Sequence, residues 1–485
     1  MRKIKLNIRN TAIAIAVWSF VTILAASFFT GCSKSETYEG FVFPEQAESS
    51  LVALSNTNVE NPIQFVDAGF KELCFAEYES DNGECRIKKM EHYYDITLDY
   101  ERFSPSEVGK AYAATVLRAI PDFHKIVEPY LYENIAGGFP AIIDDYNPVW
   151  ERISYFLDTP GTMQDEYKEE LVAFAREISG GLHGYKEDGY LSYEEAMTLN
   201  FIPEALRGTA CSALSLWGSK TETGDPMTLR LLEWHLGTDF QMCKIHAVIH
   251  VKKGKRSFTG ISFVGFQNIV SAINDDGVFA AILDVGCGEM YEYEGRKAYT
   301  YDMRWALEEF TTAKEVGSYV VENSADYTWS NQFIITDKNS SYVAENAVLQ
   351  QQEKGKAVSV LRDNKTPLLK NLKWDNPDSL CVVNSFATQG NQETMYVNHN
   401  AVRFAKYNEW VASEDAFSVA ELKSMISQEK VLQGQKKGEA AVDNVRQIYT
   451  SQMIIVDYHT GNIQVSFIPS SGPDDNVVFT DVGNY

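Results

Sequence analysis

Cys211 is the residue whose position in the chain could make it a nucleophile. It stands at the start of an expected strand, directly after a mainly helical half that ends in Arg207-Gly-Thr-Ala210. If the bond before Cys211 is broken, the residue gains a free α-amino group only a few bonds from its own thiol. An α-amine titrates near ~7.7 to 8.0 and a thiol near ~8.5, so the amine can act as the base that activates the sulfur. The position therefore predicts a cysteine nucleophile that needs no histidine.

The eight histidines offer no comparable site. His246 and His250 are four residues apart, but the segment around them alternates as a strand. Four residues of strand span about 13 Å, which is too far for two ligands of one zinc held at about 2.1 Å each. We expect strand residues there, with no metal and no cofactor. A papain-like pair of Cys211 with His399 remains an alternative, and it would require no cleavage before Cys211.

Several segments between residues 190 and 468 form an ordered series around Cys211. They are Leu191–Asn200, Ala210–Leu214, Thr228–Trp234, Val270–Gly277, Val397–His399 with Arg403–Phe404, and Asp457–Gly461. In this order they resemble the N-terminal-nucleophile linear amide C–N hydrolases, which include choloylglycine hydrolases, acid ceramidase and its N-acylethanolamine-cleaving relative, and penicillin acyltransferases. A weaker resemblance to the ceramidase-like prosegment lies at Tyr94–Asp99.

This resemblance implies five catalytic residues. Cys211 would attack the amide carbon, and Arg230 would keep its surroundings electropositive, which favours the thiolate. Glu233, where the family has aspartate, would fix the amine. Asn398 would help to hold the oxyanion, and Arg403 would complete the polar cluster.

Each of these residues also has an ordinary structural interpretation. Cys211 could be a buried structural thiol, and Arg230 with Glu233 could be a surface ion pair. Asn398 could cap the helix that begins after it, and Arg403 could be solvated on that helix. Arg230 and Glu233 are three apart and would point to opposite faces of an ideal strand, so a bulge or the strand's end is expected there.

From residue 211 onward the pattern predicts strands paired by short polar turns. The expected hairpins join 211–217 to 227–234, 243–251 to 258–266, 269–273 to 278–285, 332–336 to 341–345, and 452–458 to 462–468. Asn274 is interpreted as a turn former, and Asp284 falls where some family members place an oxyanion residue. Helices are expected at 303–321 and 401–429. Two apolar antiparallel sheets with helices outside predict an α+β, four-layer α-β-β-α sandwich, the fold of N-terminal-nucleophile hydrolases.

The preceding half is expected to be helical at 106–134 and 164–178, with a third helix starting at the capping box of Ser192 and Glu195. The expected organisation is a lipoprotein signal peptide at 1–31, a tether and N-terminal segment at 32–98, a helical prosegment at 99–210 and a catalytic domain at 211–485.

The first thirty residues predict export. Basic residues open the chain, an apolar run spans 11–29, and Phe29-Thr-Gly-Cys32 resembles a bacterial lipobox. Cleavage before Cys32 and lipid on its thiol would anchor the protein in the bacterial cell envelope, with either a periplasmic or a surface face. A single membrane-spanning anchor is the alternative.

The net charge bears on the binding partners of the protein, and the cysteines bear on its disulfides. The formal charge is −24, and a chain this acidic makes nucleic acid an unsuitable partner because binding requires a basic surface. Among the seven cysteines, Cys74 and Cys85 flank a polar turn and are the expected disulfide in an oxidising compartment.

The sequence therefore predicts an enzyme that hydrolyses a linear, non-peptide amide of a small N-acyl substrate through a thioester, after self-cleavage at Ala210–Cys211. Acyl transfer to an amine stays open, as do the acyl and amine parts of the substrate and the oligomeric state. The alternative is a catalytically inactive surface lipoprotein that binds a ligand or partner on the same fold.

Overall fold

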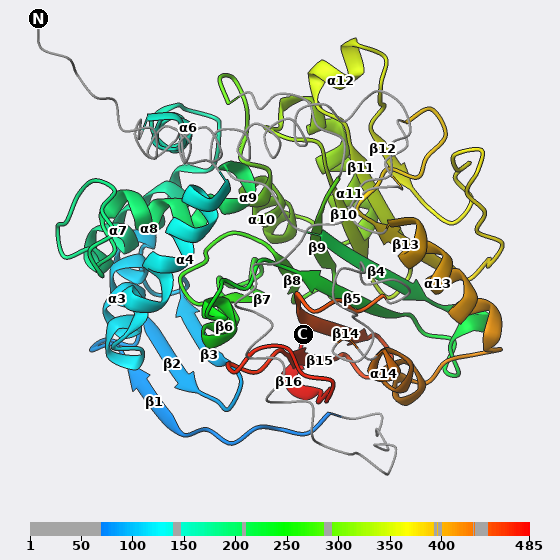
Figure 1. Ribbon diagram of the computed structural model, residues 1–485, viewed down its shortest axis with the longest axis horizontal. Coiled ribbons are helices and arrows are strands. Elements are labelled where there is room, and N and C mark those ends of the chain that lie inside the picture. Colours follow the sequence, from blue (N-terminus) through cyan, green and yellow to red (C-terminus); the bar gives the residue numbers. More distant parts are fainter. Residues whose placement is uncertain are drawn as a thin grey trace, which may run out of the picture.

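The computed structural model describes residues 69–138, 147–205, 210–285, 293–391, 395, 400–429, 431 and 445–485. Two sheets dominate it (Figure 1). The expected lipidation site Cys32, and with it Asn398 and His399, lie outside the described residues.

Ten described strands form the larger sheet. In spatial order they are β1 (Ala76–Glu79), β2 (Cys85–Lys89), β3 (Tyr94–Asp99), β6 (His246–Lys252), β7 (Phe258–Phe263), β8 (Ser271–Asn274), β9 (Phe279–Asp284), β10 (Asn331–Thr336), β11 (Ser341–Asn346) and β12 (Val360–Arg362). Neighbours pair antiparallel except β3 and β6, which pair parallel. Strands from before residue 100 therefore extend a sheet whose other members follow residue 245.

Six described strands form the smaller sheet, and all of their pairings are antiparallel. In spatial order they are β13 (Ser379–Val383), β4 (Ala210–Leu216), β5 (Met227–Glu233), β14 (Thr450–Asp457), β15 (Asn462–Phe467) and β16 (Thr480–Asn484). The five hairpins expected from the sequence are all present. At one of them Asn274 accepts a hydrogen bond from the Val278 N–H, as a turn former should.

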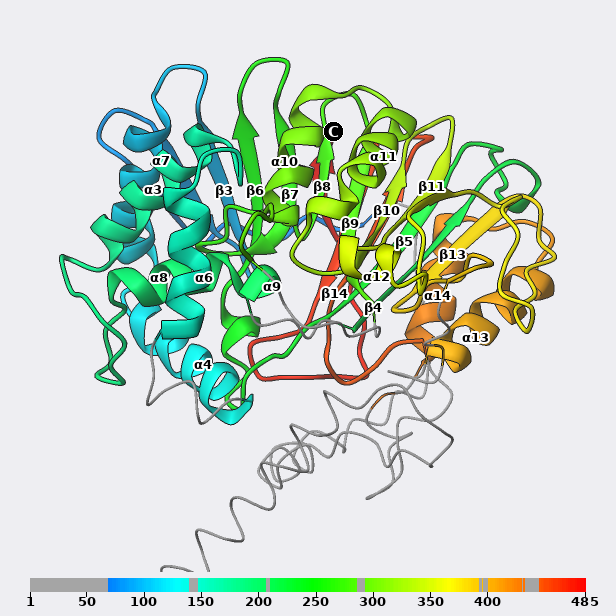
Figure 2. The same ribbon diagram turned by 90° about the horizontal axis from the view of Figure 1, so that it is seen from above.

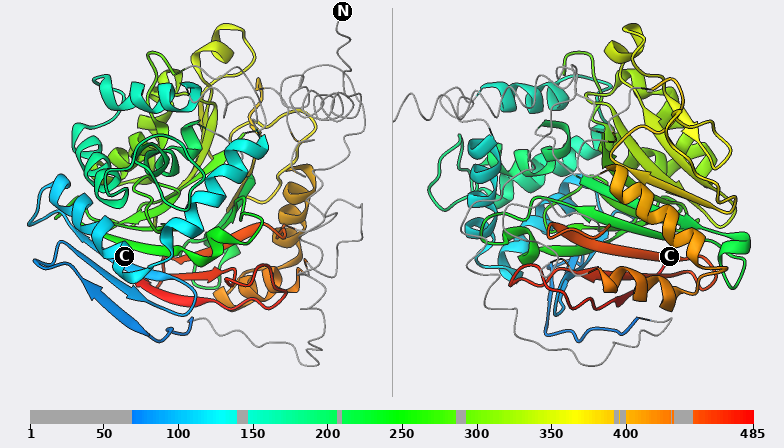
Figure 3. Two further views of the ribbon diagram at one scale, coloured as in Figure 1. Left: turned by 60° about the vertical axis from the view of Figure 1, so that its left-hand side comes forward. Right: turned by 45° about the vertical axis from the view of Figure 1, so that its right-hand side comes forward.

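Helices lie outside the two stacked sheets, some packed on a sheet face and others on neighbouring helices. They are α3 (Pro105–Ala119), α4 (Phe123–Gly138), α6 (Asn147–Asp158), α7 (Asp165–Ile178), α8 (Tyr193–Asn200), α9 (Ile202–Ala205), α10 (Tyr299–Glu309), α11 (Ala313–Glu322), α12 (Leu349–Glu353), α13 (Asn400–Ser413) and α14 (Val419–Gln428). Figure 2 shows α10 and α11 over the larger sheet, and the right panel of Figure 3 shows α13 and α14 over the smaller one. The expected α+β, four-layer α-β-β-α sandwich is confirmed.

Alternation along β4 and β5 shows how the layers pack. Leu214, Leu229 and Leu231 belong to a buried cluster with side chains of α13 and α14. Cys211 and Ala213 instead belong to the main core, together with residues of the larger sheet. Because successive side chains on a strand point to opposite faces, Cys211 points between the two sheets.

Three expected long helices are each broken in two. The segment 106–134 divides at Pro121, because proline lacks an N–H and disfavours helical geometry in the residue before it. The segment 303–321 divides where the side chain of Thr312 caps α11, and 401–429 divides where Ser418 caps α14. A side chain that satisfies free backbone N–H groups starts a new helix at each place.

The expected Cys74–Cys85 disulfide is wrong, since both thiols are free. Ala76 lies opposite Lys89, whereas Cys85 begins β2 beside the turn, where its carbonyl accepts from the Ser80 N–H. Four residues of strand, rising about 3.3 Å each, separate Ala76 from Ser80. The two cysteines thus lie at opposite ends of the hairpin, beyond the ~7 Å between Cα atoms that a disulfide can bridge.

A buried ion network joins α7, which precedes Cys211, to α10, which follows it. Arg304 lies 3.0 Å from a Glu170 carboxylate oxygen and 3.1 Å from one of Glu308, and all three side chains are buried. Removing one member of such a network leaves an uncompensated buried charge. Within the described residues no helix has the length and apolarity to cross a membrane.

Gly109→Ala tests the close packing of α3 against α7. A Cβ at Gly109 would lie 2.2 Å from the Glu170 carbonyl oxygen, so the helices must separate despite the better helix propensity of alanine. Overpacking of this kind costs about 1–3 kcal/mol, and thermal unfolding should begin several degrees lower. Gly260→Ala is the control, because its Cβ would meet nothing closer than 3.8 Å. Equal melting temperatures for the two variants would contradict this packing.

Candidate active site

Arg230 contacts the Cys211 sulfur, which also lies 4.0 Å from the Glu233 carbonyl oxygen. It projects from β5, where it lies opposite Ala213, and its Nη2 donates to the Cys211 Sγ at 3.4 Å and to the Ile282 carbonyl at 3.0 Å. Both side chains are fully buried. The Nε and Nη1 of Arg230 have no partner among the described residues. A buried cation with free donors therefore stands beside the thiol.

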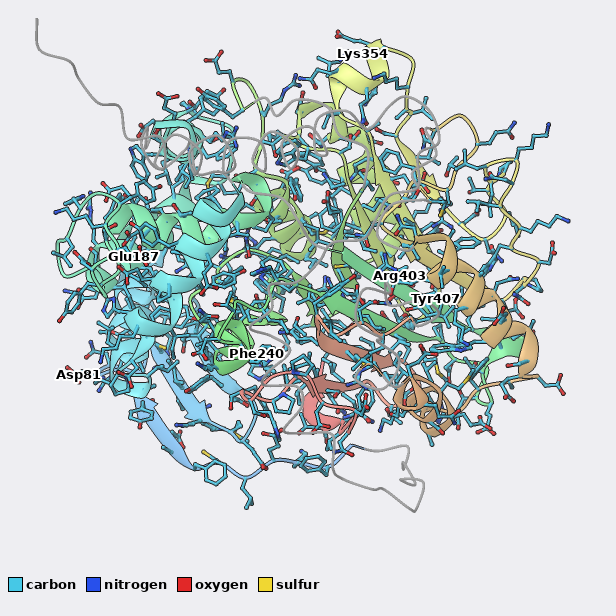
Figure 4. All side chains as sticks on the ribbon, viewed as in Figure 1. Asp81, Glu187, Phe240, Lys354, Arg403 and Tyr407 are labelled. Atoms are coloured by element: carbon cyan, nitrogen blue, oxygen red, sulfur yellow. The ribbon has the colours of Figure 1, made fainter. Side chains whose placement is uncertain are left out.

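Arg403 reaches the same residue from α13, where Figure 4 labels it together with Tyr407. Its Nη1 donates to the Cys211 carbonyl at 2.9 Å and lies 3.3 Å from Glu233 Oε2. Glu233 also accepts from Thr450 Oγ1 at 3.2 Å. Arg403 thus links the backbone of the cysteine to a buried carboxyl group.

Arg230 and Glu233 lie on opposite faces of β5. The expected contact of the Glu233 carboxyl with the Cys211 nitrogen is not the one found, because that nitrogen donates to Asn384 and the carboxyl binds Arg403. Glu233 is the last residue of the strand, and β14 has a register shift between Thr450 and Gln452 directly opposite. The expected strand end and bulge are thus both present. Arg230 nevertheless lies between the sheets, and Glu233 lies on the side of α13. Cys211 is approached on both sides because its sulfur points inward while Arg403 binds its carbonyl.

Asn384 is a site residue that the sequence prediction missed. It follows β13, whose last residue pairs with Ser212. Its Oδ1 accepts from the Cys211 N–H at 2.5 Å and from Arg403 Nη2 at 2.8 Å. Asn400 supports it, since its Nδ2 donates to the Asn384 carbonyl at 2.9 Å. The available signal was an asparagine that ends an apolar strand, which gains meaning only once that strand pairs with the cysteine strand.

The structure therefore brings together four of the five residues predicted from the sequence. With Asn384 they form the Cys211 cluster: Cys211, Arg230, Glu233, Asn384 and Arg403. The fifth, Asn398, lies outside the described residues.

Asp284 reaches the Cys211 cluster through its backbone. Its carbonyl accepts from Asn384 Nδ2 at 2.7 Å. Its carboxylate accepts from the N–H of the next residue, Val285.

In the Cys211 cluster, burial and the two arginines have opposite effects on the pKa values of Cys211 and Glu233. Burial raises the pKa of the Cys211 thiol, and the charge of Arg230 opposes that rise. Burial also raises the pKa of Glu233 to about 8, against the pull of Arg403 and then Arg230. Near neutral pH the cluster therefore favours a protonated Glu233 and two cations, and these cations favour any negative charge that forms beside them.

The two histidines that the sequence placed on a strand lie on one. His246 and His250 are strand residues of β6, and burial lowers the pKa of His246 to about 3. No group of three or more metal-binding side chains gathers in the part of the chain that the structure describes.

Comparisons with known proteins give only distant likenesses. No protein-family model and no curated protein matches the sequence. Among solved structures, an N-acylethanolamine-hydrolysing acid amidase orthologue from Caenorhabditis elegans is 11% identical over 51% of this chain and 92% of its own, with a TM-score of 0.35. A mutant conjugated bile acid hydrolase from Clostridium perfringens is 14% identical over 57% of this chain and 95% of its own, with a TM-score of 0.33.

Penicillin V acylase from Agrobacterium tumefaciens is 11% identical over 56% of this chain and 86% of its own, with a TM-score of 0.30. These proteins are of the kinds that the sequence motifs resemble. Likenesses of this size do not assign an activity, so the case for one rests on the Cys211 cluster.

Glu233→Gln tests whether burial or the ion pair sets the charge at this position. A carboxyl with a folded-state pKa of about 8 holds its proton more tightly than in the unfolded chain, where it titrates near ~4.3. That preference contributes stability fully below the unfolded value, and the contribution is lost as pH rises towards 8. The melting temperature of wild type should therefore fall relative to that of Glu233→Gln between pH 5 and pH 8, and the difference between the two should be constant above pH 8.

The exposed Glu353→Gln should show no such drift with pH. A Glu233→Gln variant that falls further behind wild type as pH rises would mean that the ion pair with Arg403 keeps Glu233 ionised.

Proposed function

We propose that the protein is an amide hydrolase whose nucleophile is Cys211, released as a chain terminus by cleavage of the Ala210–Cys211 bond. The observation that carries the proposal is the convergence on one cysteine of two arginines, a carboxyl and an amide from separate stretches of chain. Asn384 binds the backbone N–H of Cys211, Arg403 its carbonyl and Arg230 its sulfur, while the Glu233 carboxyl binds Arg403. A structural thiol requires none of them.

Cleavage can use groups already in place. The Cys211 thiolate adds to the Ala210 carbonyl carbon, and the C–N bond to Cys211 breaks as the nitrogen takes up the proton that the thiol lost. The Ala210 acyl group is then held as a thioester. Water hydrolyses that thioester, leaving a carboxylate on Ala210, a free thiol and a free amine on Cys211.

The mature site then runs the same chemistry on a substrate. The free amine of Cys211 takes the thiol proton, and the sulfur adds to the amide carbon. As the C–N bond breaks, the leaving nitrogen receives that proton, and the acyl group remains as a thioester. Water, deprotonated by the amine, releases the acid and restores the thiol. An amine in place of water would give acyl transfer.

Arg230 and Arg403 supply the electrostatics of these steps. Arg230 has two nitrogens without a partner among the described residues, in a site from which water is largely excluded. Fixed donors in such a site stabilise charge as it develops, and one donor is typically worth about 3–4 kcal/mol of barrier. Asn384 accepts from the nitrogen of Cys211 and so can orient the amine once it is free.

The substrate class follows from the sequence resemblance. We propose a linear, non-peptide amide of an N-acyl compound with an apolar acyl part. We also propose that lipid on Cys32 tethers the protein to the bacterial cell envelope. In that case the lipid lies on the fragment before residue 211, and the nucleophile stays attached through the packing of that fragment.

Amine release from a mixed N-acyl amide library, followed by mass spectrometry, tests the activity. Wild type should release an amine, and its rate should rise with pH to a plateau above about 8, as the α-amine loses its proton. Cys211→Ala should abolish release, and Arg230→Met should reduce it by roughly 100-fold through the lost donor. The exposed Cys74→Ala should match wild type. Equal rates for wild type and Cys211→Ala, or no release by either, would overturn the proposal.

Detergent phase partitioning tests the anchor. Wild type expressed in a bacterium should enter the detergent phase, because two or three acyl chains bind membranes strongly. Cys32→Ser should remain uncleaved at its signal, with a larger mass. A Cys32→Ser chain with the mass of wild type would rule out lipid on this cysteine.

A further inference from the structure

Glu345 is a fully buried carboxylate with four donors around it. It lies on β11 of the larger sheet. One oxygen accepts from Arg362 Nε at 2.9 Å and from the Ala387 N–H at 2.9 Å. The other accepts from the Thr388 N–H at 3.2 Å and from Asn391 Nδ2 at 3.0 Å. The four lone-pair sites of the carboxylate are thus filled, and three of them hold the loop that follows β13.

Arg362 extends this contact to the other side of the loop. It lies on β12, is buried, and donates through Nη2 to the Cys381 carbonyl at 2.9 Å. Cys381 precedes Asn384 by three residues, and Ala387 follows it by three. The Glu345–Arg362 pair therefore holds the chain by hydrogen bonds on both sides of Asn384, and both residues belong to the opposite sheet.

Asn384 is the point at which small displacements matter. Its Oδ1 holds both the Cys211 nitrogen and Arg403, and its Nδ2 is held by the Asp284 carbonyl. After cleavage, that nitrogen becomes the amine that shuttles protons. A shift of about 1 Å in a catalytic group can cost about 100-fold in rate.

We propose that Glu345 and Arg362 form a clamp that positions Asn384, and through it the amine of Cys211. Neither residue touches Cys211, so both are positioning residues. The inference rests on the proposed function, and it adds two residues from the larger sheet to a site built by the smaller one. An ion pair that only stabilised the fold would not need to bind the chain on both sides of Asn384.

Glu345→Gln tests the clamp in two ways. In wild-type background it should lower kcat by about 30- to 100-fold and leave KM within about threefold, because the substrate is not contacted. Hydrogen exchange can be measured in the inactive Cys211→Ala chain. There Glu345→Gln should speed amide hydrogen exchange of residues 384–391 by at least tenfold.

Glu170→Gln is the matched control, since it makes the same change in another buried Glu–Arg pair. It should lower the melting temperature without altering kcat or exchange at 384–391. If Glu345→Gln does not fold, Arg362→Lys keeps the charge, loses the bridge to Cys381, and should give the same kcat and exchange changes.

The possible results separate the two proposals. An inactive wild type would refute the proposed function, and hydrogen exchange would still decide whether Glu345 orders the loop. Unchanged exchange at 384–391 in Glu345→Gln would overturn the clamp. So would a variant that melts earlier, as Glu170→Gln does, but keeps the kcat of wild type.

Discussion

The backbone and sulfur of Cys211 are held by three separate parts of the chain, and much of the architecture serves to bring those parts together. Arg403 on α13 binds the carbonyl, Asn384 after β13 binds the N–H, and Arg230 on β5 binds the sulfur. Buried guanidinium groups are costly unless charges and hydrogen bonds surround them. The position of Cys211 therefore depends on the register of β13, β4 and β5 and on the position of α13.

Local patterns in the sequence were enough to predict the hairpins and the stacked sheets, because alternation and turn residues act over a few positions. They were not enough for contacts made across the fold. Arg230, Glu233 and Arg403 were found through motif resemblance, and the structure places both arginines on Cys211 and the Glu233 carboxyl on Arg403. The local signal at Asn384, an asparagine at the end of an apolar strand, did not identify a site residue, because its meaning comes from the pairing of β13 with β4.

The segment before Cys211 is part of the core and not an appendage. Its strands β1, β2 and β3 extend the larger sheet, and β3 pairs directly with β6. Helix α7 is tied to α10 through Arg304 and Glu170, both buried. A break between Ala210 and Cys211 would therefore leave two pieces that share one core, with the new terminus already surrounded by its polar partners.

The state of the Ala210–Cys211 bond in purified protein is the most direct test of this account. Intact-mass measurement and N-terminal sequencing under denaturing conditions should find a fragment that begins at Cys211 and ends at Tyr485, alongside a fragment that ends at Ala210. The two should elute together under native conditions, and Cys211→Ala should give a single chain. A wild-type chain that stays whole, with residue 211 still in a peptide bond, would contradict the account.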